Sequence, residues 1–280
     1  MKLSMDLSLP SVAVMGRRGS PLDGVPGVWI ALSLRRLLST QTGPVIRVRR
    51  DSDNAEANFG FGADGWLNTS ALLAWCGSAS GYVTTWWDVA GNAYANATAS
   101  EQPKIISAGV LYTAPNGRPR VQFDFQKLLL RDGVSRAAGP IYTIYMSHDT
   151  GNNSSAAFSC RTTGTAMGDF GIVTSAVSPW GVFLAFGNGS DGANGPYIQG
   201  PIVMNSGWRQ QVVCLDAVDP MIRRNKVRLA STLTIPGTPV ASTATFRIFG
   251  NIGYYGEAIF LQDAYGVSAI EADQYAAWMV

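Results

Sequence analysis

Four residues of one short stretch have the side chains of a sugar-binding platform. Trp86, Trp87 and Asp88 are consecutive in GYVTTWWDVAGN, and Asn92 closes the stretch. Indole faces cover sugar rings, and carboxylate and amide groups bond sugar hydroxyls, so these residues are candidate carbohydrate-binding residues. The alternative, which the sequence by itself favours, is a buried tryptophan pair with Asp88 capping a turn.

Two other stretches hold catalytic or metal-binding residue types in unfavourable arrangements. His148, the single histidine, precedes Asp149, but neighbours in an extended chain point to opposite sides, and no GxSxG motif is present. Segment 188–195 (NGSDGANG) is rich in oxygen ligands, yet it has one carboxylate and lacks the spacing of a calcium-binding loop. We therefore expect no nucleophilic triad, no metal and no other cofactor.

The cysteines also lack the spacing of a metal site. Cys76, Cys160 and Cys214 lie far apart among apolar or small neighbours, and no CxxC pair occurs. An odd number of cysteines argues against a domain held together by disulfides. We expect buried free thiols.

Arginine is concentrated in ALSLRRLLSTQTGPVIRVRRDSD, from Ala31 to Asp53. The chain as a whole has a formal net charge of +2 and only 14% charged residues, which is too little to argue for nucleic-acid binding. The stretch must therefore be judged by its local pattern.

That pattern predicts a helix followed by a strand. Apolar residues recur at helical spacing after Trp29, namely Ile30, Leu34, Leu37 and Leu38. Polar residues take the opposite face, namely Ser33, Arg35 and Arg36. After Thr42-Gly43-Pro44, strand alternation places Ile46 and Val48 inside and Arg47 and Arg49 outside. Most of the arginines then lie on the solvent side of folded elements.

The elements that follow predict an all-β domain. Many short β-rich runs are separated by Gly, Asn, Asp and Pro, as in a sandwich or jelly roll. Asn68 or Thr69 is placed to cap a short helix through SALLAWC. Ser268 and Glu271 have the spacing of a capping box that would begin a C-terminal helix.

The first 26 residues differ from the rest. Leu3, Met5, Leu7 and Leu9 share one parity, and RRGSPLDGVPG follows as a turn-rich linker. This predicts an extended arm over residues 1–26 that adds a strand to its own domain or to a neighbouring subunit, and one domain over residues 27–280. Asp6 and Pro10 interrupt the apolar run, so we expect neither a signal peptide nor a membrane span.

Several motifs carry a family resemblance. They are LDGVPG, ALSLRRLLSTQTGPVIRVRRDSDN, LNTSALLAWCG, GYVTTWWDVAGN, QPKIISAGV and NGRPRVQFDF, and they cover about residues 22–126. In this part the chain resembles the concanavalin A-like domain of bacteriophage virion and tail proteins, and more distantly the catalytic domain of B-type arabinofuranosidases. GYYGEAIFLQDAYGVSAIEADQ resembles the last strand and helix of these domains. The resemblance implies a concanavalin A-like jelly-roll β-sandwich with a short helix near its N-terminal side and a C-terminal helix.

The two carboxyl groups that hydrolysis requires are missing from the matching stretches of this chain. Retaining hydrolysis needs two carboxyl groups about 5 to 5.5 Å apart. The resemblance implies a Glu in the stretch SPWGVFLAFGNG and an Asp in FRIFGNIGYYGE, but the first has no carboxylate and the second has Asn251 at the relevant position. We expect no catalytic residues, and we expect that the protein is not an enzyme.

Three hypotheses follow for function. The first is a structural component of a bacteriophage virion, made in the bacterial cytoplasm, with the arm bound to other virion proteins and the jelly roll exposed in a homo-oligomer. The second is a carbohydrate-binding module for a host-surface glycan, and the third is an arabinofuranosidase-like hydrolase. None of them involves nucleic acid or membrane insertion.

Overall fold

A computed structural model describes residues 19–123, 127–149, 155–161, 170–174, 182–185, 197–199, 207–215, 220–229, 232–234, 242–249 and 253–280. Its strands are β1 (Val28–Ser33), β2 (Ile46–Arg50), β3 (Glu56–Phe59), β4 (Gly81–Trp87), β5 (Ala93–Ala95), β6 (Lys104–Ser107), β7 (Val110–Leu111), β8 (Val121–Phe123), β9 (Leu128–Arg136), β10 (Ile141–Asp149), β11 (Ser155–Arg161), β12 (Phe170–Thr174), β13 (Val182–Ala185), β14 (Tyr197–Gln199), β15 (Arg209–Leu215), β16 (Met221–Arg224), β17 (Val227–Arg228), β18 (Thr232–Thr234), β19 (Ser242–Phe249) and β20 (Gly253–Leu261). Its helical segments are α1 (Thr69–Cys76), the 3-10 turn η1 (Ala99–Glu101) and α2 (Val267–Met279). The prediction of an all-β fold with a C-terminal helix is confirmed.

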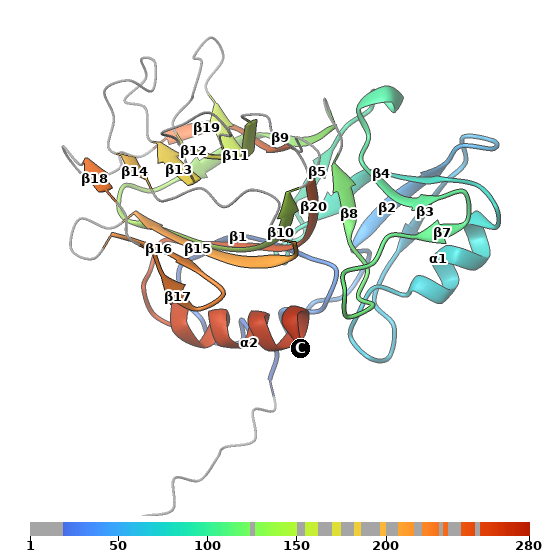
Figure 1. Cartoon of the computed structure of the whole chain (residues 1–280). Coiled ribbons are helices and arrows are strands. Elements are labelled where there is room, and N and C mark those ends of the chain that lie inside the picture. Colours follow the sequence, from blue (N-terminus) through green and yellow to red (C-terminus); the bar gives the residue numbers. More distant parts are fainter. Residues whose placement is uncertain are drawn as a thin grey trace, which may run out of the picture.

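Two antiparallel layers face each other in a β-sandwich (Figure 1). One layer has the strand order β1-β20-β10-β15-β16-β17. The other has the order β9-β19-β11-β12-β13-β14-β18. Strands β2 to β8 extend the sandwich at one end, joined to the layers through the β5–β9 and β20–β8 pairs.

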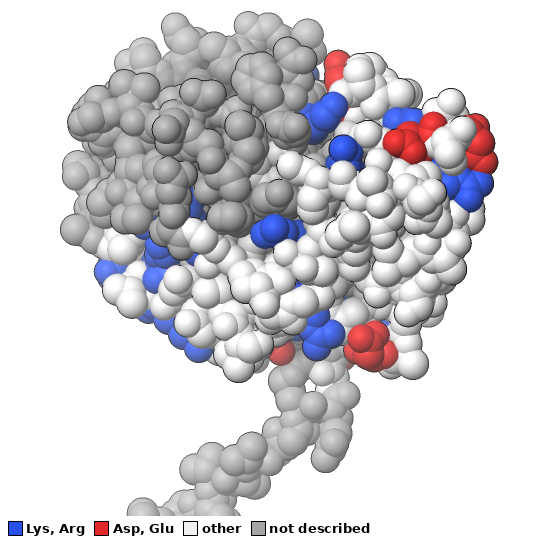
Figure 2. All heavy atoms as spheres, turned by 45° about the vertical axis from the view of Figure 1, so that its right-hand side comes forward, with Lys and Arg blue, Asp and Glu red and all other residues white. Residues whose placement is uncertain are grey.

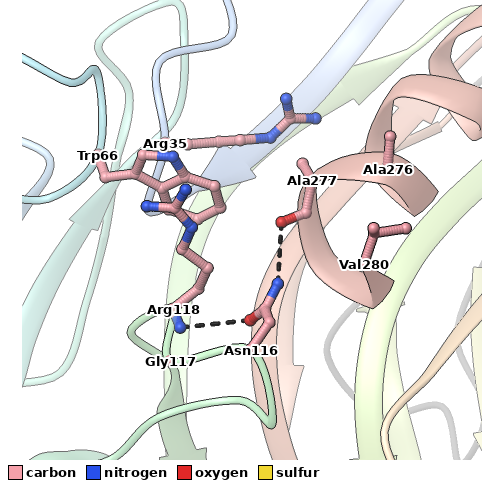
Figure 3. Close-up of a pocket in the computed structure, with 8 residues that line it drawn as sticks. All are labelled: Arg35, Trp66, Asn116, Gly117, Arg118, Ala276, Ala277 and Val280. Atoms are coloured by element: carbon pink, nitrogen blue, oxygen red, sulfur yellow. Dashed lines mark hydrogen bonds between the residues drawn. The ribbon is translucent and has the colours of Figure 1, made fainter.

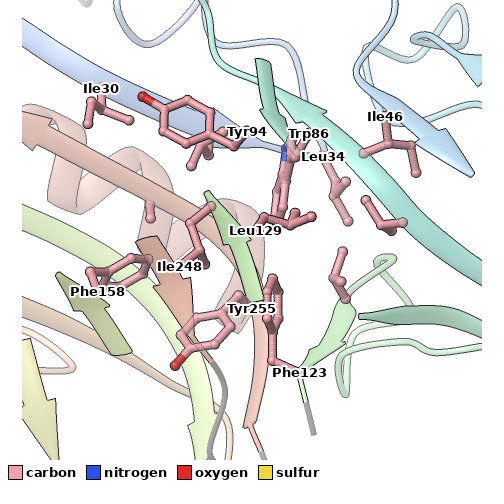
Figure 4. Close-up of a cluster of buried hydrophobic side chains, with 14 of the residues drawn as sticks. Ile30, Leu34, Ile46, Trp86, Tyr94, Phe123, Leu129, Phe158, Ile248 and Tyr255 are labelled. Atoms are coloured by element: carbon pink, nitrogen blue, oxygen red, sulfur yellow. The ribbon is translucent and has the colours of Figure 1, made fainter. Parts of the chain in front are cut away.

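Buried side chains from both layers fill the space between them (Figure 4). Ile30 of β1 and Phe260 of β20 come from one layer, and Leu129 of β9 and Phe158 of β11 come from the other. The ring centroids of Phe158 and Phe260 are 5.2 Å apart, in an edge-to-face arrangement. Each fully buried side chain of this size contributes about 1.5–3 kcal/mol to folding, so this core holds the layers together.

Helix α2 covers the outer face of the first layer (Figure 1). Val267 and Ile270 of the helix pack on Val212 and Cys214 of β15 and on Ile259 of β20. These strands are therefore buried on both faces. Cys76 and Cys214 are buried, as expected, while the side chain of Cys160 lies outside the described residues.

The segment that begins near Trp29 is a strand, so the predicted amphipathic helix is wrong. Strand β1 pairs with β20, and its residues alternate between two apolar environments. Ile30 and Leu32 face the sandwich core, while Ala31 faces the cluster under α2. Because both faces of β1 are buried, apolar residues occupy successive positions and imitate a helical period. The short helix near the N-terminal side is α1 instead.

Both helices lie where the sequence predicts them, but only one begins as predicted. The Asn68 side chain accepts a hydrogen bond from the Ala71 N–H at 3.1 Å and caps α1. The capping box of Ser268 and Glu271 is not formed, because the N-cap of α2 is Gly266, with φ +81°, two residues before Ser268. Glu271 is buried against the strands and does not turn back toward the helix start.

The arginine-rich stretch forms a scaffold rather than a basic surface. Arg36 is exposed, and Arg47 and Arg49 are partly exposed on β2, as predicted. Leu37 and Val48, on the apolar side of the pattern, are fully buried. Figure 2 shows basic and acidic side chains dispersed in small groups over this face of the molecule.

Arg35 departs from this pattern, because it is buried where the sequence places it in solvent. Its Nε lies 2.7 Å from Oε2 of Glu257, and its Nη2 lies 3.0 Å from Oε1 of Glu257 and 2.7 Å from Oδ2 of Asp273. Ser33 and Trp278 also donate to Oε2 of Glu257. The network joins the end of β1 to β20 and α2. Arg35 is thus a structural residue of the interior.

Candidate functional site

The carboxylate of Asp88 closes the turn between β4 and β5. Its Oδ1 accepts hydrogen bonds from the N–H groups of Ala90 (2.9 Å) and Asn92 (2.8 Å), and its Oδ2 accepts one from Nδ2 of Asn92 (2.9 Å). Gly91 has φ +82° in the same turn, a conformation that glycine adopts without strain. Asp88 is buried, so both of its oxygens serve the hairpin.

The two tryptophans point to different environments, because neighbours in a strand face opposite sides. Trp86 is 2% exposed and belongs to the sandwich core. Trp87 is partly exposed, and the Arg47 guanidinium lies 5.9 Å from its ring centroid. Trp87 is therefore the member of the pair that meets solvent.

A hollow of about 360 Å³ lies between the β4–β5 turn and the loop over residues 40–44. Trp87 and Asp88 line one side. Thr40, Gln41 and Thr42 line the other. The hollow thus combines an indole with hydroxyl and amide groups, and Asp88 is the carboxylate among its lining residues.

Backbone and side-chain hydrogen bonds fix the two walls of this hollow. The Gln41 N–H donates to the Leu38 carbonyl at 3.1 Å, and Oε1 of Gln41 accepts from the Leu37 N–H at 3.3 Å. The Trp87 N–H donates to the Val45 carbonyl at 2.9 Å. The segment after the loop and the end of β4 are therefore held to each other by a backbone hydrogen bond.

The free polar groups of the hollow are neutral. Within the described part of the chain, no hydrogen bond uses the hydroxyl of Thr40 or Thr42, and none uses Nε2 of Gln41. Thr40 and Thr42 are exposed. The described residues also contain no cluster of three His, Cys, Asp or Glu side chains suited to a metal ion. This hollow can supply hydrogen bonds and an apolar surface, and its one lining carboxylate, Asp88, is already bonded to the hairpin.

The structure brings together part of the sequence-predicted site. Trp87 and Asp88 line one hollow, whereas Trp86 is in the core and Asn92 holds the Asp88 carboxylate. The polar loop residues Thr40, Gln41 and Thr42 are not among the site residues predicted from the sequence. Their stretch, TQTGP, has the composition of an ordinary turn, and it lies far from Trp87 in the sequence.

Other predicted residues fall outside the described residues. They are the arm residues Leu3, Met5, Leu7 and Leu9, the loop over 188–195, and Asn251. His148 lies in β10, opposite Tyr254 of β20. Among the described residues, no helix is long and apolar enough to cross a membrane.

Comparisons with known proteins identify the fold. No protein-family model and no curated protein sequence matches the chain. A solved structure of a GH54 α-L-arabinofuranosidase soaked with a cyclic sulfate inhibitor is similar, with a TM-score of 0.64 and 15% identity. An arabinofuranosidase complexed with arabinofuranosyl-α-1,2-xylobiose gives a TM-score of 0.64 and 14% identity.

Both alignments cover 92% of this chain but only 64% of the arabinofuranosidase chain, so this chain spans less than two thirds of those proteins. At these identities the likeness is one of fold. The chain is a jelly-roll β-sandwich of the type found in these carbohydrate-active enzymes.

Proposed function

We propose that this protein binds a neutral carbohydrate at the Trp87 hollow and does not hydrolyse it. The observation that carries the proposal is the partly exposed Trp87 indole beside the free hydroxyls of Thr40 and Thr42. An indole covers the apolar face of a sugar ring, and hydroxyl and amide groups bond the ring's own hydroxyls. The volume of about 360 Å³ lies within the range of small-molecule sites.

The fold supports the same ligand class. An arabinofuranosidase of similar fold is known in complex with arabinofuranosyl-α-1,2-xylobiose. Arabinose- and xylose-containing oligosaccharides are therefore the first ligands to test. Because the free groups of Thr40, Gln41 and Thr42 are uncharged, a neutral glycan suits the hollow better than an acidic one.

The side chains of the hollow favour binding over hydrolysis. Both retaining and inverting glycosidases use two carboxyl groups at the bond that is cleaved. Here Asp88 is the carboxylate among the lining residues, and its oxygens accept three hydrogen bonds from the hairpin. A carboxylate that is buried and bonded in this way is not available as a nucleophile or as a general acid.

The proposal is tested by a glycan array followed by calorimetric titration of a neutral oligosaccharide. Thr42→Ala removes one free hydroxyl and should weaken binding about threefold to tenfold, the worth of one hydrogen bond. Thr98→Ala is the matched control, because Thr98 is also exposed and its side chain caps nothing. Absence of binding to every neutral glycan, or an equal loss in both variants, would overturn the proposal.

Assembly into a phage particle stays a prediction. It depends on the sequence motifs and on an arm whose residues 1–18 lie outside the described residues. Deleting residues 1–20 should leave the melting temperature nearly unchanged and should abolish incorporation into particles. Normal co-sedimentation of the truncated chain with particles would contradict the anchoring role.

A further inference from the structure

Two adjoining hollows on another part of the surface share Arg35 and Trp66. The first, of about 320 Å³, is also lined by Asn116, Arg118 and Ala277 (Figure 3). The second, of about 650 Å³, is also lined by Arg36, Asp64 and Asp273. Because they share two lining residues, the hollows adjoin, and we call the two together the Trp66 groove.

The groups along the Trp66 groove come from separate segments and are held in place. The Arg118 guanidinium lies 4.2 Å from the Trp66 ring centroid. Nδ2 of Asn116 donates to the Ala277 carbonyl of α2 at 3.1 Å (Figure 3). Oδ1 of Asp64 accepts from the Trp66 N–H at 3.0 Å. A ligand would therefore meet groups that are already ordered, which reduces the entropy lost on binding.

Trp66 itself is held in place by Trp278. Its ring packs edge-to-face on Trp278, with centroids 5.0 Å apart, and Trp278 donates to Glu257 in the Arg35 network. The floor of the groove is thus connected to the Arg35–Glu257 network that joins β1, β20 and α2. Ala277 adds a small apolar wall on the helix side.

The charges along the groove balance. Its cations are Arg35, Arg36 and Arg118. The carboxylates are Asp64 and Asp273, with Glu257 bonded to Arg35 from within the core. Nη1 of Arg118 lies 3.8 Å from Oδ2 of Asp64, and their side chains are 41% and 62% exposed. The groove therefore offers donors and acceptors side by side, with no excess of either sign to select an ion.

We infer that the Trp66 groove is a second carbohydrate site, separate from the Trp87 hollow, for a neutral glycan of at least two sugar units. Paired guanidinium and carboxylate groups donate to and accept from adjacent sugar hydroxyls, and the volumes of the two hollows suit small-molecule ligands. The inference rests on the proposed function for its ligand class alone. Its residues and its test are independent of Thr40, Thr42 and Trp87.

The test follows the tryptophan indole N–H signals by NMR while the full chain is titrated with neutral arabinoxylo-oligosaccharides. We expect the Trp66 signal to shift, with affinity rising from one sugar unit to two or more. Arg118→Lys keeps the charge but loses the planar guanidinium, and should weaken the change at Trp66 about tenfold. Arg50→Lys is the matched control, because Arg50 also lies over a tryptophan, Trp75, and pairs with an aspartate, Asp53.

Each outcome separates the two sites. A shift at Trp66 without one at Trp87 supports the second site and contradicts the proposed function. A shift confined to Trp87 overturns the second site and leaves the proposed function intact. Equal loss in Arg118→Lys and Arg50→Lys also overturns the inference.

Ionic strength tests the ligand class. Binding of a neutral glycan at the Trp66 groove should change less than about twofold between about 50 and about 500 mM salt. Tighter binding of oligogalacturonate than of the neutral oligosaccharide, with a steep salt dependence, would overturn the assignment to neutral glycans.

Discussion

Arg35 and Glu257 form a two-point ion pair in the interior, with Nε–Oε2 at 2.7 Å and Nη2–Oε1 at 3.0 Å. The Glu257 side chain is completely buried, and that of Arg35 is 9% exposed. The pair connects the end of β1 to β20, and α2 joins it through Asp273 and Trp278. The floor of the Trp66 groove therefore depends on a polar network inside the domain.

Removing the charge of only one member of this pair should strongly lower the free energy of unfolding. Glu257→Gln leaves the Arg35 charge buried without its main partner, and we expect a loss of about 3–5 kcal/mol in the free energy of unfolding. Urea denaturation measures it. Asp53→Asn, which removes a carboxylate from the exposed Arg50–Asp53 pair, is the control and should have a much smaller effect. Similar losses in both variants would contradict the structural role of the buried pair.

The same pair predicts how stability depends on pH. Burial acts to raise the pKa of Glu257, but the Arg35 charge and the hydrogen bonds from Arg35, Ser33 and Trp278 together hold that pKa below its ordinary value. A carboxyl group whose pKa is lowered by folding stabilises the folded state above its unfolded pKa, and this contribution is lost as the pH falls through the folded pKa. We expect the free energy of unfolding to fall below about pH 4.5, and this fall should be smaller in Glu257→Gln. Urea denaturation between pH 7 and pH 3 tests this, and identical pH profiles for both proteins would contradict it.

Gly256 leaves room for the Trp278 ring. A Cβ at this position would overlap Cη2 of Trp278. Gly256→Ala should displace the indole from Glu257 and cost at least about 1–3 kcal/mol, as overpacked cores do. Thermal melting and the near-ultraviolet circular dichroism of tryptophan measure the change. An unaltered melting temperature would contradict this prediction, because it would mean that α2 moves to accommodate the methyl group without loss of stability.

Leu37 and Arg47 distinguish the apolar and polar sides of the arginine-rich stretch. Leu37 is fully buried under α2, so Leu37→Ala should lower the free energy of unfolding by about 2–5 kcal/mol. Arg47 is 43% exposed in the side chain and pairs weakly with Glu56 at 3.9 Å. Arg47→Ala should lower stability by less than about 1 kcal/mol. Equal losses in urea denaturation would mean that Arg47 has a larger structural role than its exposure indicates.

Local features of the fold were predictable from the sequence, because the interactions that create them join residues close in the chain. Asn68 caps α1 through a hydrogen bond to a residue three positions away. Ile46 and Val48 alternate with arginines on β2, and this period is sufficient to assign their inner face. The turn at Asp88 follows from an aspartate that bonds nitrogens two and four residues later.

The candidate sites depended on tertiary structure. β1 resembles a helix in sequence, because burial on both faces removes the alternation that identifies a strand. Arg35 looks solvent-exposed until Glu257 pairs with it from 222 positions away. The Trp87 hollow exists because β4 ends beside a loop more than 40 residues earlier in the chain. Local sequence determined which residues turn, cap and alternate, whereas long-range packing decided which charges are buried and which polar groups meet at one surface.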